Sequence, residues 1–129
     1  MVKYIDTDVF VYWATDHPEH GQRATEIIRR IETHEKAVTS ALSFWTFNNL
    51  MRTQNGFSLR LFLDQVRRLR NLRIVPLDAD TLAQASDLVR EKNLSPHVAV
   101  AAAVAKSKGA DAVYTTNAEY DRTGLKRAF

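Results

Sequence analysis

The side chains best suited to chemistry in this sequence are oxygen donors that follow two short apolar segments. The set comprises Asp6, Asp8, Asn117, Glu119 and Asp121. Carboxylate and amide oxygens gathered from distant segments are the ligands that Mg²⁺ and Mn²⁺ prefer, and these ions drive in-line phosphodiester cleavage. This donor set is therefore a candidate site for Mg²⁺ or Mn²⁺ and indicates nuclease chemistry.

Asp6 and Asp8 stand where the first apolar segment, Val2-Lys-Tyr-Ile5, must end. Aspartate is poorly suited to a strand interior, so two of them indicate a pair placed at a strand end. In an open parallel sheet, ligands bind in the crevice beyond the carboxyl ends of the strands. A structural alternative stays open, in which Asp8 caps a following helix and Asp6 ends a turn.

Two histidine positions offer weaker signals. His17 and His20 have the spacing of metal ligands on one helical turn, but Pro18 between them in a polar stretch favours a solvated helix start. His97, beside the Ser95-Pro96 helix start, is either a capping group or a group in the crevice.

An arginine-rich stretch carries most of the positive charge. Residues 51–73 hold six arginines against Asp64, a sum of +5, so the rest of the chain is −2 for a net charge of +3. Such a stripe is a footprint for polyanions, although a solvated helix face is the plainer interpretation. Arginine without lysine favours bidentate phosphate contact. The candidate substrate-binding residues are Arg52, Arg60, Arg67 and Arg68.

Hydrophobic periodicity predicts alternating strands and helices. Strands are expected over residues 2–5, 37–39, 73–76 and 112–115, with a short fifth over 125–129. Helices are expected from Ala24 to Thr33, after the capping residues Ser40, Ser58 and Asp80, and from Ser95-Pro96 to Lys108, where Gly109 ends the last one. Trp45, Phe44 and Phe47 are expected in the core or an interface rather than as a base-stacking platform. This pattern predicts one α/β domain over residues 1–129, with three layers and a mainly parallel sheet of four to five strands flanked by helices.

Composition narrows the functional classes. The 129 residues include no cysteine, which excludes disulfides, zinc-thiolate sites and thiol catalysis. No glycine-rich phosphate loop, nucleophile elbow, signal peptide or membrane-spanning stretch is present, so we expect a cytoplasmic protein without membrane partners.

Four segments in order resemble the PIN domain, most closely the small prokaryotic ribonucleases of VapC toxin type. They are Tyr4-Ile-Asp-Thr-Asp-Val9, Thr39-Ser-Ala-Leu42, Leu94-Ser-Pro-His97 and Thr115-Thr-Asn-Ala-Glu-Tyr-Asp-Arg122. The resemblance implies a metal-dependent endoribonuclease with a four-acid site for Mg²⁺ or Mn²⁺, an RNA substrate, an antitoxin-type protein partner and a homodimer.

The sequence departs from that family pattern at three of its four acids. The first acid matches Asp6, but the other three fall on Thr46, Val98 and Asn117, while Asp121 matches a supporting acid. The resemblance therefore implies Asp6, Asp8 and Asp121 as metal ligands, and Asp6, Asn117 and Asp121 as catalytic residues. Holding two metal ions about 3.5–4 Å apart needs more counter-charge than this. We expect catalysis to be weakened or lost. The alternative to a weakened enzyme is a non-catalytic module that binds RNA or a protein partner.

Overall fold

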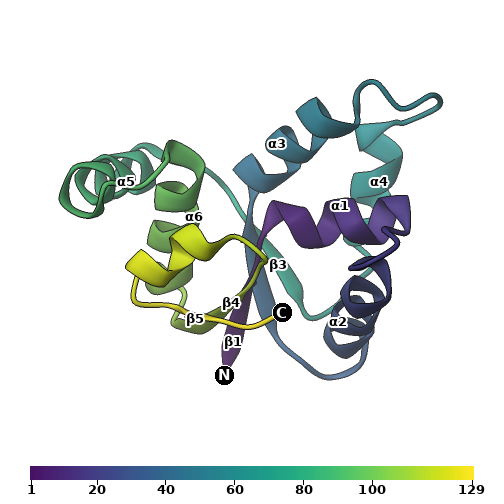
Figure 1. The fold of residues 1–129 in the computed structure, drawn as a ribbon, viewed down its shortest axis with the longest axis horizontal. Coiled ribbons are helices and arrows are strands. Elements are labelled where there is room, and N and C mark those ends of the chain that lie inside the picture. The colour runs from purple at the N-terminus through teal and green to yellow at the C-terminus, as the bar shows by residue number, and fades with distance from the viewer.

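A parallel five-stranded sheet forms the centre of the computed structural model, which describes residues 1–129. The strands lie in the order β3-β2-β1-β4-β5, and every neighbouring pair is parallel. Helices cover both faces of the sheet (Figure 1), so the predicted three-layer α/β fold is confirmed. The strands are β1 (Val2–Ile5), β2 (Ala37–Ser40), β3 (Leu72–Val75), β4 (Ala110–Tyr114) and β5 (Lys126–Arg127).

Four helices pack on one face of the sheet and form the larger aromatic core. They are α1 (Thr7–Thr15), α2 (Gly21–Thr33), α3 (Ala41–Met51) and α4 (Leu59–Val66). Phe10, Phe44, Phe47 and Phe62 meet in this core, and the Phe47 and Phe62 rings stack with centroids 4.4 Å apart. Alternate residues of the strands, such as Ile5, face this side.

The other face is covered by α5 (Ala79–Lys92), α6 (Pro96–Ser107) and the 3₁₀ helix η1 (Ala118–Arg122). Every residue of α6 from Val98 to Ala105 is buried, as the nearly continuous apolar sequence predicts. Its small alanines let α6 pack closely on α5 and on the strands. None of the helices is both long and apolar enough to cross a bilayer.

Several predicted boundaries hold and others need correction. Ser40 and Ser58 cap α3 and α4 as predicted. The cap of α5 is Asp78 rather than Asp80, because Asp78 Oδ1 accepts from Thr81 N at 2.8 Å and Asp80 already lies in the first turn. β3 starts one residue earlier than predicted and stops before Pro76, and β4 starts at Ala110 rather than Ala112.

Trp45 is also placed differently from its neighbours. Phe44 and Phe47 are buried as predicted, but Trp45 is 59% exposed on the outer side of α3. Of the two predicted positions for Trp45, the core is therefore wrong, and an interface stays a prediction.

The aromatic core should dominate the stability of the domain. Phe47 is fully buried, so Phe47→Ala should lower the free energy of unfolding by about 3–5 kcal/mol through lost contacts and a residual cavity. Trp45→Ala, a larger truncation on the same helix, should cost less than about 1 kcal/mol because its ring is mostly exposed. Urea denaturation of both variants measures the difference, and equal losses would contradict the packing described.

Candidate functional site

The candidate site lies where the order of the strands reverses, at the carboxyl ends of β1 and β4. β1 leads to β2 and β3 on one side of the sheet, whereas β4 and β5 lie on the other. Open parallel sheets bind ligands at such a switch point. Asp6 directly follows β1, and its backbone N–H donates to the Tyr114 carbonyl of β4 at 3.1 Å. The two central strands therefore fix the position of Asp6.

Both carboxylate oxygens of Asp6 have partners. Oδ1 accepts from Thr7 N at 2.8 Å, and Oδ2 accepts from Thr115 Oγ1 at 2.7 Å. The first contact makes Asp6 the N-cap of α1, and the side chain is only 4% exposed. The structural alternative, in which Asp8 is the cap and Asp6 ends a turn, is therefore wrong as stated, because Asp6 itself is the cap.

Asp8 lies in the first turn of α1 and binds the end of β4. Its Oδ2 accepts from Thr116 N at 2.7 Å and Thr116 Oγ1 at 2.6 Å, and lies 3.3 Å from Thr115 Oγ1. Its Oδ1 is buried and has no partner. The structure thus brings Asp6 and Asp8 together around Thr115.

The electrostatics of this pair disfavour charge on Asp6. Burial, and then the nearby charge of Asp8, raise the pKa of Asp6, although the hydrogen bonds from Thr115 and Thr7 act in the opposite direction. The Tyr120 hydroxyl is buried close to Asp6, and burial together with the Asp6 charge raises the pKa of Tyr120. Tyr120 therefore stays protonated beside the carboxylate.

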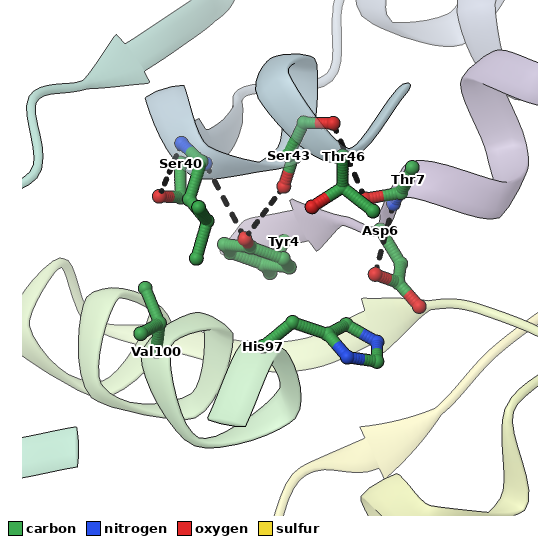
Figure 2. Close-up of a pocket in the computed structure, with 9 residues that line it drawn as sticks. Tyr4, Asp6, Thr7, Ser40, Ser43, Thr46, His97 and Val100 are labelled. Carbon is green, nitrogen blue, oxygen red and sulfur yellow. Dashed lines mark hydrogen bonds between the residues drawn. The ribbon is translucent and has the colours of Figure 1, made fainter. Parts of the chain in front are cut away.

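Asp6 is the one acid that lines a small pocket between α3 and the start of α6. Figure 2 shows its carboxylate facing the same space as the His97 ring, with Thr46 above them on α3. The pocket has room for about one water molecule, because the centre of a water-sized sphere can occupy about 10 Å³ of it. Its lining residues are Tyr4, Asp6, Thr7, Ser40, Leu42, Ser43, Thr46, His97 and Val100.

The neutral polar groups of this pocket form a fixed wall. Tyr4 OH lies 3.1 Å from Ser43 Oγ and accepts from Ser40 N at 3.3 Å. Burial raises the pKa of Tyr4 to about 12, so the phenol is neutral. The pocket can thus hold a water molecule or a small polar group, and Asp6 is its only source of negative charge.

The oxygen-bearing side chains after β4, Asn117 and Asp121, do not line this pocket. Asn117 Oδ1 accepts from Glu119 N at 3.0 Å and caps η1. Asp121 forms a bidentate pair with Arg127, with both N···O distances 3.1 Å, beside an open hollow that Thr115 and Thr116 also line. Asp121 therefore faces Arg127 rather than Asp6.

Glu119 fixes the start of α6. Its Oε2 accepts from Ser95 N at 2.9 Å and from Ser95 Oγ at 2.6 Å, so Ser95 begins the helix without using its own side chain as a cap. Burial favours the neutral carboxyl, but these two hydrogen bonds and the Arg122 charge outweigh it and lower the pKa of Glu119. This contact holds the first turn of α6, and with it His97, against the end of β4.

The positions at which the family acids were expected are neutral and diverge. Thr46 lines the pocket, whereas Val98 is fully buried in the α6 core and does not. His97, which precedes Val98 and is exposed, is the residue from the first turn of α6 that lines the pocket. Of the two predictions for His97, a capping group or a group in the crevice, the structure therefore agrees with the crevice. No group of three or more His, Asp or Glu side chains is placed to hold a metal ion.

Sequence patterns could have found more of the lining. Tyr4 and Asp6 are two residues apart on a strand and its extension, so both point to the same side. Ser43 and Thr46 follow Ser40 at intervals of three, which places all three on one side of α3. The role of Thr115 has no comparable signal, because it depends on the pairing of β1 with β4.

The histidine and arginine candidates lie away from the pocket, apart from His97. His17 Nδ1 accepts from the backbone N–H of Glu19 and of His20 just before α2, as a helix start requires. The four arginine candidates are exposed at the end of α3 and in or just after α4, and none lines the Asp6 pocket. These candidates are Arg52, Arg60, Arg67 and Arg68.

Comparisons with known proteins agree with the fold described above. The profile described as PIN domain matches residues 3–126. The VapC20 toxin of Mycobacterium tuberculosis, which cleaves the sarcin-ricin loop, superposes with a TM-score of 0.77 at 20% identity, covering 95% of each chain. VapBC2 of Rickettsia felis, bound to promoter DNA, superposes with a TM-score of 0.72 at 17% identity, covering 99% of this chain and 98% of that chain. FitAcB of Neisseria gonorrhoeae superposes with a TM-score of 0.68 at 18% identity, covering 100% of this chain and 97% of that chain. No curated protein sequence matches the chain.

The raised pKa of Asp6 makes a prediction about stability. A carboxyl whose pKa is higher in the folded state favours folding at pH values below its unfolded pKa, and this contribution is lost as pH rises through the folded pKa. Asp6→Asn keeps an oxygen for Thr7 N and removes the charge, so it should raise the melting temperature at neutral pH by roughly 2–4 °C. The gain should vanish near the unfolded pKa of about 4.

Thermal melts of the native protein and Asp6→Asn across this pH range measure the effect. Asp111→Asn, which removes an exposed carboxylate paired with Lys3, is the matched control and should change the melting temperature little. A lower melting temperature for Asp6→Asn at neutral pH would show that the charged carboxylate stabilises the fold.

Proposed function

The chain belongs to the PIN-domain family. We propose that it is a VapC-type member that has lost metal-dependent cleavage and acts as a module that binds RNA and a protein partner. The observation that carries this proposal is the composition of the pocket at the switch point. Asp6 is its only acid, and the remaining polar groups are neutral hydroxyls and His97.

The residues present do not fit the pair of Mg²⁺ or Mn²⁺ ions that the family implies. Two metal ions about 3.5–4 Å apart need several carboxylates between them. Here the Asp6 oxygens accept from Thr7 and Thr115, and Asp8 Oδ2 is occupied by Thr116. Only Asp8 Oδ1 is free of a partner, and Asp121 pairs with Arg127. A bound pair of metal ions therefore has no part in the proposed function.

RNA binding is supported by an exposed aromatic ring beside an arginine. Trp45 and Arg67 line the same groove, together with apolar residues of α3, α4 and β3. An exposed ring allows a base to stack, and a guanidinium contacts a phosphate, which is how single strands are bound without sequence readout. Arg52, Arg60 and Arg68 are exposed at the end of α3, in α4 and just after α4, and they add positive charge to this part of the surface.

A protein partner is supported by a second groove, between α1 and α4. Trp13, Met51, Phe57, Leu61 and Phe62 line it, and Leu61 is 67% exposed. An amphipathic helix buries its apolar side in a groove of this kind. We assign this groove to an antitoxin-type partner, and the exposed Leu50 at the end of α3 to a homodimer contact.

A weakened metal-dependent endoribonuclease is the second candidate. The proximity of Asp6 and Asp8 and the unpartnered Asp8 Oδ1 favour it, since one Mg²⁺ can be held by one or two carboxylates, water and substrate phosphate. In this function Asp6, Asp8 and Asp121 would be the metal ligands, and Asp6, Asn117 and Asp121 the catalytic residues.

A binding experiment with labelled single-stranded RNA separates the two candidates. We expect anisotropy titrations to show binding that is unchanged by EDTA and that weakens as salt rises, because phosphate contacts release counterions. Arg67→Gln combined with Arg68→Gln should weaken binding several-fold and reduce the slope of log K against log salt by roughly 1. Removal of two arginines elsewhere, Arg29→Gln with Arg90→Gln, is the control of equal charge.

Calorimetric titration of Mn²⁺ and an RNA cleavage assay complete the test. The proposal expects no saturable Mn²⁺ binding at about 1 mM and no cleavage stimulated by Mn²⁺. Mn²⁺ binding and cleavage that both disappear in Asp6→Asn would establish the endoribonuclease instead.

A further inference from the structure

A second hollow lies at the amino ends of β2 and β3, at the opposite end of the sheet from Asp6. It is open to solvent, and the space over its walls, part of it bulk solvent, amounts to about 580 Å³. Apolar residues near the strand starts form its base, and four cations surround it, whereas no acid lines it. We call this the amino-end hollow, and its cations are Lys36, Arg70, Arg73 and Lys108.

The fold brings these four cations together from three separate segments. Lys36 directly precedes β2, Arg70 precedes β3, and Arg73 lies within β3 opposite Val38 of β2. Lys108 ends α6 just before Gly109 turns the chain into β4 with φ of 72°. Neither hydropathy nor charge pattern along the sequence indicates this convergence.

Strand alternation explains why Arg73 faces the hollow. Its neighbours Leu72 and Ile74 pack into the aromatic core on the α1–α4 side, so Arg73 points to the α5–α6 side. Val75, two residues further, is buried on that side. On the α5–α6 side, the first half of β3 is therefore not covered by a helix. It carries the exposed Arg73 at a position where a covered strand would have an apolar residue.

The frame of the hollow is rigid although its cations are free. Asn71 Nδ2 donates to the Ile31 carbonyl at 2.7 Å, and Ala37 N donates to the Asn71 carbonyl at 2.9 Å. By contrast, the seven ion pairs of the structure include none of the four cations. Asp78 interacts electrostatically with Lys108 without forming an ion pair, and its carboxylate already caps α5.

We propose that the amino-end hollow binds adjacent phosphate groups. Four neighbouring cations that form no ion pair repel one another, and an anion bound among them reduces that repulsion. Arg70 and Arg73 offer bidentate forks for phosphate oxygens, and Lys36 and Lys108 add point charges. A single phosphate would leave part of this charge unmatched, so the site fits two or more linked phosphates.

Two sources supply this chemistry, an RNA backbone and a small polyphosphate compound. Arg70 follows Arg67 by three residues and Arg68 by two, so an RNA strand bound at α4 can extend to the hollow. This RNA source rests on the proposed function, whereas the small-molecule source does not. In either case the site is separate from the Asp6 pocket by about the length of the strands, roughly 13 Å for four residues.

The test uses sodium tripolyphosphate in calorimetry and labelled single-stranded RNA in anisotropy. Arg70→Gln combined with Arg73→Gln should reduce tripolyphosphate affinity about tenfold or more, whereas Arg29→Gln with Arg90→Gln should leave it unchanged apart from a small effect of net charge. All four arginines are exposed, so matched thermal melts verify that each variant is folded.

The RNA titrations identify the source and separate this inference from the proposed function. RNA affinity that falls in the hollow variant identifies the backbone, whereas loss confined to tripolyphosphate identifies a small polyphosphate. Tripolyphosphate binding that is absent, or equal in hollow and control variants, overturns the inference. In that case RNA binding lost only with Arg67→Gln and Arg68→Gln would still support the proposed function.

Discussion

The contact on which the crevice depends is the Thr115 hydroxyl between the carboxylates of Asp6 and Asp8. A hydroxyl has one proton, and the distances show that it is donated to Asp6 at 2.7 Å rather than to Asp8 at 3.3 Å. Asp8 is held instead by the backbone and side chain of Thr116. These contacts fasten the start of α1 to the end of β4 across the switch point, and they thereby define one wall of the pocket.

These threonines also explain how two neighbouring acids are tolerated without a cation. Burial and mutual repulsion disfavour the charged pair, while donated hydrogen bonds stabilise it. In a metal site the ion would supply this stabilisation and the lone pairs would point towards it. Here three of the four oxygens already accept from the protein, so Asp8 Oδ1 is the only one of them that a metal would find without a hydrogen bond. The acids serve the fold first, which agrees with neutral residues at Thr46 and Asn117.

The sequence predicts the fold well because its signals are local and repeated. Capping by Ser40 and Ser58, the apolar α6 and the alternation of strands and helices each report on a few adjacent residues. Asp6 at a strand end follows from the same reasoning. His97 in place of Val98, the pairing of Asp121 with Arg127 and the capping of α6 by Glu119 do not, because each depends on where two distant segments meet. A shift of one residue along α6 changes which side chain reaches the pocket, and periodicity does not resolve one residue.

The distribution of charge across the sheet favours binding over cleavage. The carboxyl end carries one pocket acid with hydrogen-bonded oxygens. By contrast, arginines outnumber the single acid Asp64 around α4, and four cations that form no ion pair lie at the amino ends of β2 and β3. Cleavage by metal ions needs concentrated negative charge in the protein to recruit cations against an anionic substrate. A protein that only binds a polyanion needs the opposite, which is positive charge spread along the path of the phosphates. The chain carries the second arrangement and little of the first, which supports the proposal that it binds a nucleic acid rather than cutting one.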